Sequence, residues 1–392
     1  MWTLGEAVPA AFAVTARIRG RCGHERLRDA VGHVRRRHPM LAVRVTDIGL
    51  TSAWITTQDV PEPPLRIAEG HWEQVVAEEL GTPFDASAGP PARFVVIDHG
   101  DFFDLTVICH HLIGDGLSLA HLLHDVVVYL ADPESPAETV AAPPMHDLVK
   151  AMPRPPRSEA FKQPGSSWPV RPRTSNDGVA LVNRVLDTAE GAALKERCRA
   201  EQTSVHAALG LAGLRALADL DGDTRRQFFY PVSLRPLLTE LPEGACGTYA
   251  IEVFTWFDLM ADTEFWPAAR NLKHMIVRQT APDRLLRQVR LVSLTNVLPN
   301  TLMSRLLRVS CKPYPSFTLS NLGRLPFPAG HGDFGIESMH LAVHMGTLSN
   351  GILTAVTVED RLSLTMTTTD AAATAAEQTM KATLGHLRTA IG

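Results

Sequence analysis

The chain has 392 residues, of which 45% are hydrophobic and 20% charged, and its formal net charge at pH 7 is -4. That length suits two domains of ordinary size with a substantial core. The slightly negative charge, without long runs of one sign, argues against a nucleic-acid-binding protein, which would carry a basic stripe.

Cysteine usage and hydropathy indicate the compartment. The five cysteines are scattered, without a Cys-x-x-Cys pair, which is typical of a reducing compartment and argues against a metal cluster. The first fifteen residues contain Glu6 and Pro9 and lack a basic start, so we expect no signal peptide. No run of eighteen apolar residues occurs, so we expect no membrane span. The sequence therefore predicts a cytoplasmic monomer without a bound metal.

Extended and helical patterns alternate in the first hundred residues. An apolar run predicts a strand over Ala11–Ile18. Apolar residues from Leu27 to Val34 then recur at i, i+3, i+4 and i+7, the spacing of an amphipathic helix. This helix should end near Arg37, because the residue before Pro39 is biased away from the helical region. Strands over 41–45 and 52–57 and a helix over 71–81 are expected next.

Two strands and a helix enclose the most distinctive motif. Residues 93–98 and 103–109 alternate as the strands of a hairpin. The second strand ends in Cys109-His110-His111-Leu112-Ile113-Gly114-Asp115-Gly116, a His-His-x-x-x-Asp-Gly pattern, and an apolar helix over 117–130 follows. Two histidines and an aspartate thus stand where a strand ends and a helix begins. Rigid elements can present a side chain to a crevice at such a place.

The chemistry of this motif is that of a general base. A neutral imidazole can take a proton from a hydroxyl or amine that attacks a carbonyl. Alternate residues of a strand share a face, so we expect His111 to point into a cavity and His110 into the protein. Asp115 either forms an ion pair with an arginine elsewhere, which would fix the loop, or only caps the following helix. Gly116 would permit a tight turn.

Cys109 offers an alternative chemistry. It shares a face with His111 if the strand is regular to its end, so a Cys–His nucleophile is conceivable. A reactive thiol needs exposure and a lowered pKa. Cys109 lies deep in the predicted strand, which favours the histidine as the base.

Proline density divides the chain. Prolines are frequent between Ala131 and Asp177, and this forbids regular structure over most of the segment. We predict an N-terminal half over 1–131, a linker and crossover over 132–177, and a C-terminal half over 178–392. A short helix over 145–152 is expected inside the linker.

The second half repeats the mixture of strands and helices. The predicted strands are 179–186, 228–232, 247–254, 316–323, 336–343, 353–358 and 362–368. The predicted helices are 188–200, 204–220, 262–279, 285–309 with a break at Pro299, and 371–391. The sequence therefore predicts an α/β protein.

The motif at His110–Gly116 resembles that of the condensation-domain and chloramphenicol-acetyltransferase-like superfamily, which includes polyketide-associated acyltransferases. The earlier Arg37-His38-Pro39-Met40-Leu41 resembles the end of the first helix in the same proteins. The resemblance implies an α/β fold of two related halves, each a mixed sheet with helices, and a tunnel between them. It also implies that His111 is the general base and that Asp115 is structural.

Two stretches of the second half extend the resemblance. Arg235, followed a dozen residues later by Gly247 and an extended run, resembles the middle of the family's second half, which implies an ion pair with Asp115. The alternative is a surface turn residue. The stretch 316–323 resembles the strand that faces the histidine across the tunnel. Ser320 or Asn321 would then donate a hydrogen bond to the oxyanion, unless this is only a strand followed by a turn.

The resemblance implies an acyltransferase of secondary or lipid metabolism, for example of polyketides. The acyl donor would be a thioester, either acyl-CoA or a phosphopantetheinyl acyl carrier protein, and the acceptor a small-molecule alcohol. No permanently bound cofactor is required. One alternative is a stand-alone condensation enzyme that joins carrier-bound units to an amine acceptor as an amide. Another is an inactive relative that only docks a carrier protein.

Overall fold

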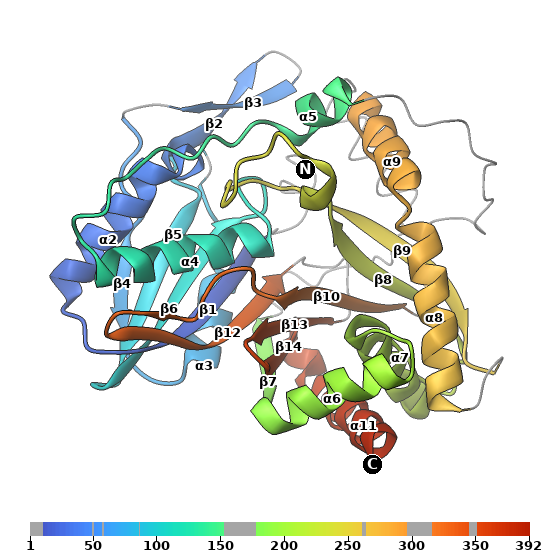
Figure 1. Cartoon of the computed structure of the whole chain (residues 1–392). Helices are drawn as coiled ribbons and strands as arrows, with labels where there is room; N and C mark the ends of the chain where they lie inside the picture. Colours follow the sequence, from blue (N-terminus) through green and yellow to red (C-terminus); the bar gives the residue numbers. More distant parts are fainter. Residues whose placement is uncertain are drawn as a thin grey trace.

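The computed structural model contains two six-stranded sheets with helices around them and a separate two-stranded ribbon (Figure 1). It describes residues 11–48, 51–56, 59–85, 87–152, 178–260, 264–295, 316–344 and 351–392.

The first sheet has the strand order β11-β12-β1-β6-β5-β4. Its strands are β1 (Ala11–Arg19), β4 (Leu65–Ala68), β5 (Ala92–Asp98), β6 (Phe102–His110), β11 (Gly330–His331) and β12 (Phe334–His344). β4 runs parallel to β5, whereas the other neighbours are antiparallel, so the sheet is mixed. β6, which leads into the His-His-x-x-x-Asp-Gly motif, lies in the middle between β1 and β5.

Helices cover both faces of the first sheet (Figure 1). α2 (His24–Arg37) and α4 (Gly116–Ala131) pack on one face, where α4 buries apolar side chains such as Leu119, Leu122 and Val126. α3 (Trp72–Gly81) packs on the other face with Trp72 and Val76. Because both faces of the sheet are covered at β5, its successive residues Phe94–Ile97 are all apolar and buried rather than alternating.

The second sheet has the order β7-β14-β13-β10-β8-β9. Its strands are β7 (Val179–Leu186), β8 (Arg225–Ser233), β9 (Ala250–Asp258), β10 (Ser316–Arg324), β13 (Ile352–Val358) and β14 (Arg361–Thr369). β10 runs parallel to both of its neighbours, β13 and β8, and the remaining pairs are antiparallel. This sheet is therefore mixed as well.

Helices pack on one face of the second sheet and enclose the larger apolar cluster. They include α6 (Thr188–Ala200), α7 (Val205–Asp221), α8 (Phe265–Gln279), α9 (Pro282–Thr295) and α11 (Ala373–Ile391). The central α7 has local start and stop signals: the Ser204 side chain accepts from Ala207 N, and Gly222 closes the helix at φ 75°. A hydroxyl cap and a left-handed glycine satisfy groups that the helix itself leaves unpaired.

The remaining elements are small. They are α5 (Met145–Ala151), the ribbon of β2 (Val43–Ile48) and β3 (Thr51–Thr56), and the short helices η1 (Pro39–Ala42), η2 (Arg235–Leu237) and η4 (Asp370–Ala372).

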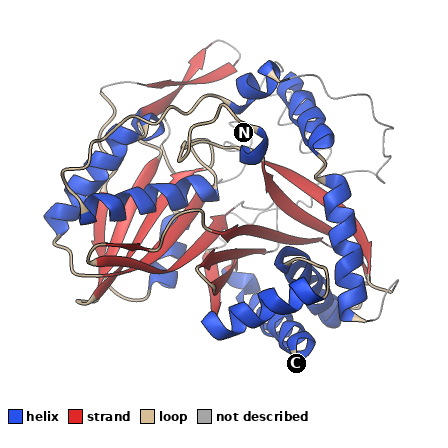
Figure 2. Cartoon of the chain, viewed as in Figure 1, coloured by secondary structure: helices blue, strands red, loops and turns tan. Residues whose placement is uncertain are grey.

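One segment of the C-terminal part crosses back to the first sheet. β11 and β12 follow β10 of the second sheet in sequence, yet they hydrogen-bond in the first sheet, with β12 beside β1. β12 also touches the second sheet: the Thr354 hydroxyl donates to the Leu341 carbonyl, and Val343 N donates to Thr367 Oγ1 over 3.1 Å. Figure 2 shows the two sheets meeting where these strands lie. β12 thus belongs to the first sheet and also links the two lobes through these hydrogen bonds.

The two mixed sheets with their helices confirm the predicted fold class. One predicted strand is shifted: β9 begins at Ala250 rather than at Gly247, because residues 247–249 hydrogen-bond to the motif of the first lobe instead of to a strand. The short strands β4 and β11 were not predicted.

Some predictions fall where the structure gives no description. The predicted helix over 285–309 is observed as α9 up to Thr295, and its remainder lies outside the described residues. α5 matches the short helix expected inside the linker, but residues 153–177 also lie outside them. The division into halves at 132–177 and the tunnel between the halves therefore stay predictions.

The described residues contain no candidate for a membrane span or a metal cluster. None of their helices is long and apolar enough to cross a membrane. Among the same residues, no group of three or more His, Cys, Asp or Glu side chains is arranged to hold a metal ion.

Candidate active site

His111 lies immediately after β6, in the tight turn that leads to α4. β6 ends at His110, so the strand delivers the histidine pair and the turn reorients the second ring. The His111 ring is buried against Phe12 of β1, with the two ring centroids 3.9 Å apart. A rigid strand on one side and a capped helix on the other therefore fix its position.

The hydrogen bond of His111 determines which ring nitrogen carries the proton. Nδ1 lies 3.0 Å from the carbonyl oxygen of Gly114. Because a carbonyl only accepts, Nδ1 must carry the hydrogen, and in the neutral ring Nε2 then has the free lone pair. No hydrogen bond between described residues involves Nε2. Burial lowers the pKa of His111 and outweighs the hydrogen bond to Gly114, which raises it. His111 is thus a neutral imidazole with Nε2 as its basic atom.

Asp115 is the N-cap of α4 and accepts hydrogen bonds with both carboxylate oxygens. Oδ1 accepts from Ser118 N at 2.8 Å and from Arg235 Nη2 at 3.2 Å. Oδ2 accepts from Tyr249 N at 3.0 Å. The cap and the ion pair, considered as alternatives from the sequence, occur together.

Asp115 is ionised despite its burial. Burial raises the pKa of this carboxyl, but Arg235 and the hydrogen bonds from Tyr249 and Ser118 outweigh it, so the pKa lies below its usual range. Arg235 is only 13% exposed at its side chain, and the pair is largely shielded from water. Such a pair holds its two chain segments together, because either charge left alone would be costly.

Arg235 joins the second lobe to the motif. Its Nη1 donates to the Ala245 carbonyl at 3.0 Å, its Nη2 donates to Ser118 Oγ at 2.8 Å, and its guanidinium lies over the Tyr249 ring. The segment 245–249 is thereby held against the start of α4. The predicted partner of Asp115 is brought to it across 120 positions of sequence.

The same segment contacts the backbone of the candidate base. The Thr248 hydroxyl donates to the carbonyl oxygen of His111 over 2.6 Å. Gly247 N donates to Ser118 Oγ at 3.1 Å. The turn that carries His111 is therefore fixed from the second lobe as well as from β6 and α4.

The role predicted for Gly116 needs correction. Its backbone is not in the left-handed region, so it does not serve a turn that requires glycine. A Cβ added at Gly116 would instead lie 3.1 Å from Leu322 of β10 and from Leu341 of β12. Glycine at this position allows the start of α4 to approach both strands closely.

His110 and Cys109 are buried at the end of β6. Burial lowers the pKa of His110 to about 4, and its Nδ1 accepts from Leu112 N at 3.2 Å. Burial also raises the pKa of the Cys109 thiol well above its usual value. A thiol that stays protonated is a poor nucleophile, so the geometry favours His111 over the Cys–His alternative.

Ser320 and Asn321 lie near the end of β10. Ser320 is buried, and its strand neighbour Leu322 reaches the start of α4. Asn321 Oδ1 accepts from Gly323 N at 2.8 Å, where the strand has a bulge, and Gly323 adopts φ 71°. Asn321 retains its amide N–H groups as donors. Among the described residues, neither side chain forms a hydrogen bond with the His111 side chain.

Sequence reasoning missed Gly114, Ser118 and Thr248. Gly114 acts through its carbonyl, which every residue has, and a lone serine or threonine has no pattern. For Ser118, the position three residues after a candidate N-cap was a usable signal, because such a residue donates to the cap. Thr248 could be recognised only once residues 111 and 248 were known to be neighbours.

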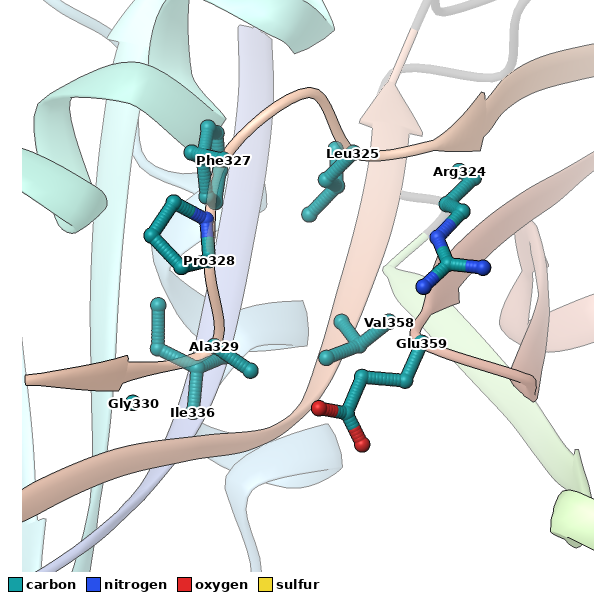
Figure 3. A pocket seen from close by; sticks show the side chains of 9 residues that line it. All are labelled: Arg324, Leu325, Phe327, Pro328, Ala329, Gly330, Ile336, Val358 and Glu359. Atoms are coloured by element: carbon teal, nitrogen blue, oxygen red, sulfur yellow. The ribbon is translucent and has the colours of Figure 1, made fainter.

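The described residues also line a pocket of about 200 Å³ away from the motif. It lies beside the segment Leu325–Ala329 that connects β10 to β11. Figure 3 shows Phe327 and Pro328 on one side and Arg324 and Glu359 on the other. None of the predicted site residues lines it.

The fold of this chain matches known structures, although its sequence matches no known family. No family model matches the sequence, and no curated protein matches it by sequence. Solved structures do match. The polyketide synthase associated protein 5 from Mycobacterium tuberculosis superposes with a TM-score of 0.71 and 14% identity, over 99% of this chain and 96% of that one.

Two further structures come from synthetases. The first condensation domain of the calcium-dependent antibiotic synthetase gives a TM-score of 0.72 and 13% identity, over 100% of this chain and 94% of that one. The epimerization domain from the third module of tyrocidine synthetase B gives a TM-score of 0.65 and 14% identity, over 100% of this chain and 96% of that one. This protein therefore has the two-lobed condensation-domain fold, in agreement with the resemblance inferred from its motifs.

Proposed function

We propose that this protein is an acyltransferase that moves an acyl group from a CoA or carrier-protein thioester to a hydroxyl acceptor. The observation that carries the proposal is the fixed tautomer of His111. The Gly114 carbonyl keeps the proton on Nδ1, and Nε2 is left as a neutral base in a site shielded from water. General-base catalysis by a neutral histidine is the chemistry that such an arrangement supports.

The reaction needs one base and no covalent enzyme intermediate. Nε2 of His111 takes the proton of the acceptor hydroxyl as its oxygen attacks the thioester carbon. The tetrahedral oxyanion then collapses, the C–S bond breaks, and the imidazolium returns its proton to the leaving thiolate. The products are an ester and a free thiol.

The oxyanion requires hydrogen-bond donors. We assign this role to the Ser320 hydroxyl or the Asn321 amide, since β10 passes the start of α4 next to Leu322. A donor aimed at the developing charge typically contributes about 10²–10³ in rate. The Asp115–Arg235 pair acts at a distance from the reacting atoms and positions the turn that carries His111.

The names of the similar structures support a thioester as the acyl donor. One is associated with a polyketide synthase, and another is a condensation domain of an antibiotic synthetase. An acceptor amine would react by the same proton transfer and give an amide, which is the second product class to be tested.

The test incubates the full chain with acyl-CoA and acyl-carrier-protein donors and a panel of alcohols and amines, with mass detection of acylated products. Wild type should form an ester, and His111→Ala should lower turnover by about 10²–10⁴-fold. The exposed His274 provides the control, since His274→Ala should leave turnover unchanged.

Three outcomes would change the assignment. A predominance of amide products would make the protein a condensation enzyme. Undiminished turnover in His111→Ala would remove His111 as the base. Carrier binding without turnover by wild type would indicate a docking protein.

A further inference from the structure

One face of β8 and β9 in the second sheet packs against helices. On β8 and β9, Phe228, Tyr230, Val253 and Phe257 point into the apolar cluster with the helices. Alternation places the intervening residues on the opposite face, which we call the inner face. It is defined here by Gln227, Phe229, Pro231, Glu252, Phe254 and Trp256, which pair across the two strands.

β9, which carries part of the inner face, begins next to the candidate active site. Thr248 precedes β9 by two residues, and its hydroxyl donates to the carbonyl of His111. Glu252 follows four residues after Thr248, within β9. Four residues of fully extended chain span roughly 14 Å at most, so the two Cα atoms lie within about that distance of each other. A substrate at His111 that extends along this segment would therefore reach Glu252.

Glu252 is an unusual group on this face. Its neighbours there are Pro231, directly opposite on β8, and the pair Phe229 and Phe254, whose ring centroids are 5.5 Å apart. Its backbone carbonyl accepts a hydrogen bond from Gln288 Nε2 at 2.7 Å. Among the described residues no side chain pairs with the carboxyl group.

The surroundings of this carboxyl oppose its ionisation. Glu252 is partly exposed, yet the protein around it removes water and raises the pKa of its carboxyl to about 7. A carboxylate without a partner in such a place costs free energy. Groups of this kind occur disproportionately where a ligand supplies the missing partner.

We propose that Glu252 determines acceptor specificity by binding a positively charged amine of the acceptor substrate. The inference rests on the proposed acyl transfer and adds the class of acceptor: an alcohol with a basic nitrogen set back from the reacting hydroxyl. The aromatic pair Phe229 and Phe254 lies next along the face and suits the apolar part of such a molecule. A pantetheine arm, which is a chain of neutral amides ending in a phosphate, does not complement a carboxylate.

The test compares amino alcohols of increasing chain length with unsubstituted alkanols of the same length, at a fixed acyl donor. Ester products are identified by their lability in mild base, which separates them from amides. At one chain length, wild type should prefer the amino alcohol by about tenfold or more in kcat/KM, the minimum expected for a shielded charge pair. The preference should appear in KM, because the contact exists before and during reaction.

Glu252→Gln keeps the shape and removes the charge. It should reduce the preference for the amino alcohol to within about twofold, because the charge pair is lost. Glu240→Gln changes an exposed glutamate in the preceding loop and should leave the preference intact. The proposal is overturned if Glu252→Gln still prefers amino alcohols over alkanols. It is also overturned if the preference depends on an amine in the acyl chain instead of in the acceptor.

Direct binding separates this inference from the proposed function. Calorimetry with hexylamine and hexanol needs no turnover, and His111→Ala should retain the tighter binding of the amine while losing acyl transfer. If wild type acylates nothing but binds hexylamine through Glu252, the acyl-transfer proposal fails and the cation site stands. Equal binding of the two ligands to wild type removes the cation site.

Discussion

At the scale of single residues, the environment of His111 sets the pH range of the proposed reaction. Burial places the pKa of the imidazole below its ordinary 6.5, and the active form is the neutral ring. As pH falls, kcat/KM should therefore decline with a midpoint below 6.5. Rates measured between about pH 5 and 9, with circular dichroism to confirm folding, check this. A midpoint above 6.5 would contradict it.

The Asp115–Arg235 pair should contribute more to the stability of the fold than to the chemical step. Asp115→Asn leaves Arg235 without its buried partner and should lower the free energy of unfolding by about 3–5 kcal/mol in denaturant titrations near neutral pH. Glu377→Gln, which breaks the half-exposed pair with Arg184, should cost less than about 1 kcal/mol.

The same pair predicts a pH dependence of stability. The pKa of Asp115 is lower in the folded than in the unfolded chain, so its contribution is complete above 3.8, the ordinary value. The contribution is lost as pH falls through the lower, folded value. The difference between wild type and Asp115→Asn should thus hold from neutrality to about pH 4 and shrink below it. A difference that grows in acid would contradict this assignment.

Some features of single residues could be predicted from the sequence, and others could not. Arg235 could be paired with Asp115 because a resemblance supplied their relation. The proton on Nδ1 of His111 could not be predicted, since it depends on the carbonyl of Gly114 after the turn has formed. The charge environment of Glu252 arises from packing between strands and has no local signal at all.

At the scale of elements, close packing of helix on sheet makes a sharp prediction for two glycines. A Cβ added at Gly213 of α7 would lie 2.0 Å from Phe317 of β10, whereas one at Gly385 of α11 meets nothing within 4 Å. Gly213→Ala should therefore destabilise by about 1–3 kcal/mol. Gly385→Ala should stabilise by roughly 0.5–1 kcal/mol, the helix preference for alanine. Thermal unfolding measures the stability change of both variants. Equal changes would show that helix propensity alone, and not packing against Phe317, determines the effect of alanine.

Elements with strong periodicity could be predicted, and short ones could not. α2 and α4 follow from apolar residues at helical spacing, and β6 from its apolar run. β4 has only four residues and includes Arg66, and β11 has two, so neither produces a pattern. Gly247–Tyr249 looked extended because its residues suit a strand, but its hydrogen bonds go to the motif of the other lobe.

At the scale of the whole molecule, the crossing of β12 makes the first lobe dependent on the second half of the chain. β12 contributes Ile336, Met339, Leu341 and Val343 to the apolar cluster beneath α4. At roughly 1.5–3 kcal/mol for each buried side chain, their loss approaches the whole stability of a typical domain, about 5–15 kcal/mol.

A fragment of residues 1–152 should therefore fail to fold when produced alone and should recover structure when produced with residues 178–392. Circular dichroism and size exclusion of the single and paired fragments measure this, with the full chain as reference. Cooperative unfolding of the short fragment by itself would show that the first sheet does not need β12. This crossing was not predicted, because strand order across a sheet is decided by contacts far apart in the chain.

The connection from β10 to β11 has a mechanical consequence. Leu325–Ala329 contains Pro326 and Pro328, and each proline fixes its φ angle and removes a backbone donor. Such a stretch is a stiff connection, so a displacement of one strand is passed on to the other. β10, with the proposed oxyanion donors, and β11 should consequently move as one rigid unit. A ligand would then bind to a preformed site rather than induce closure around itself.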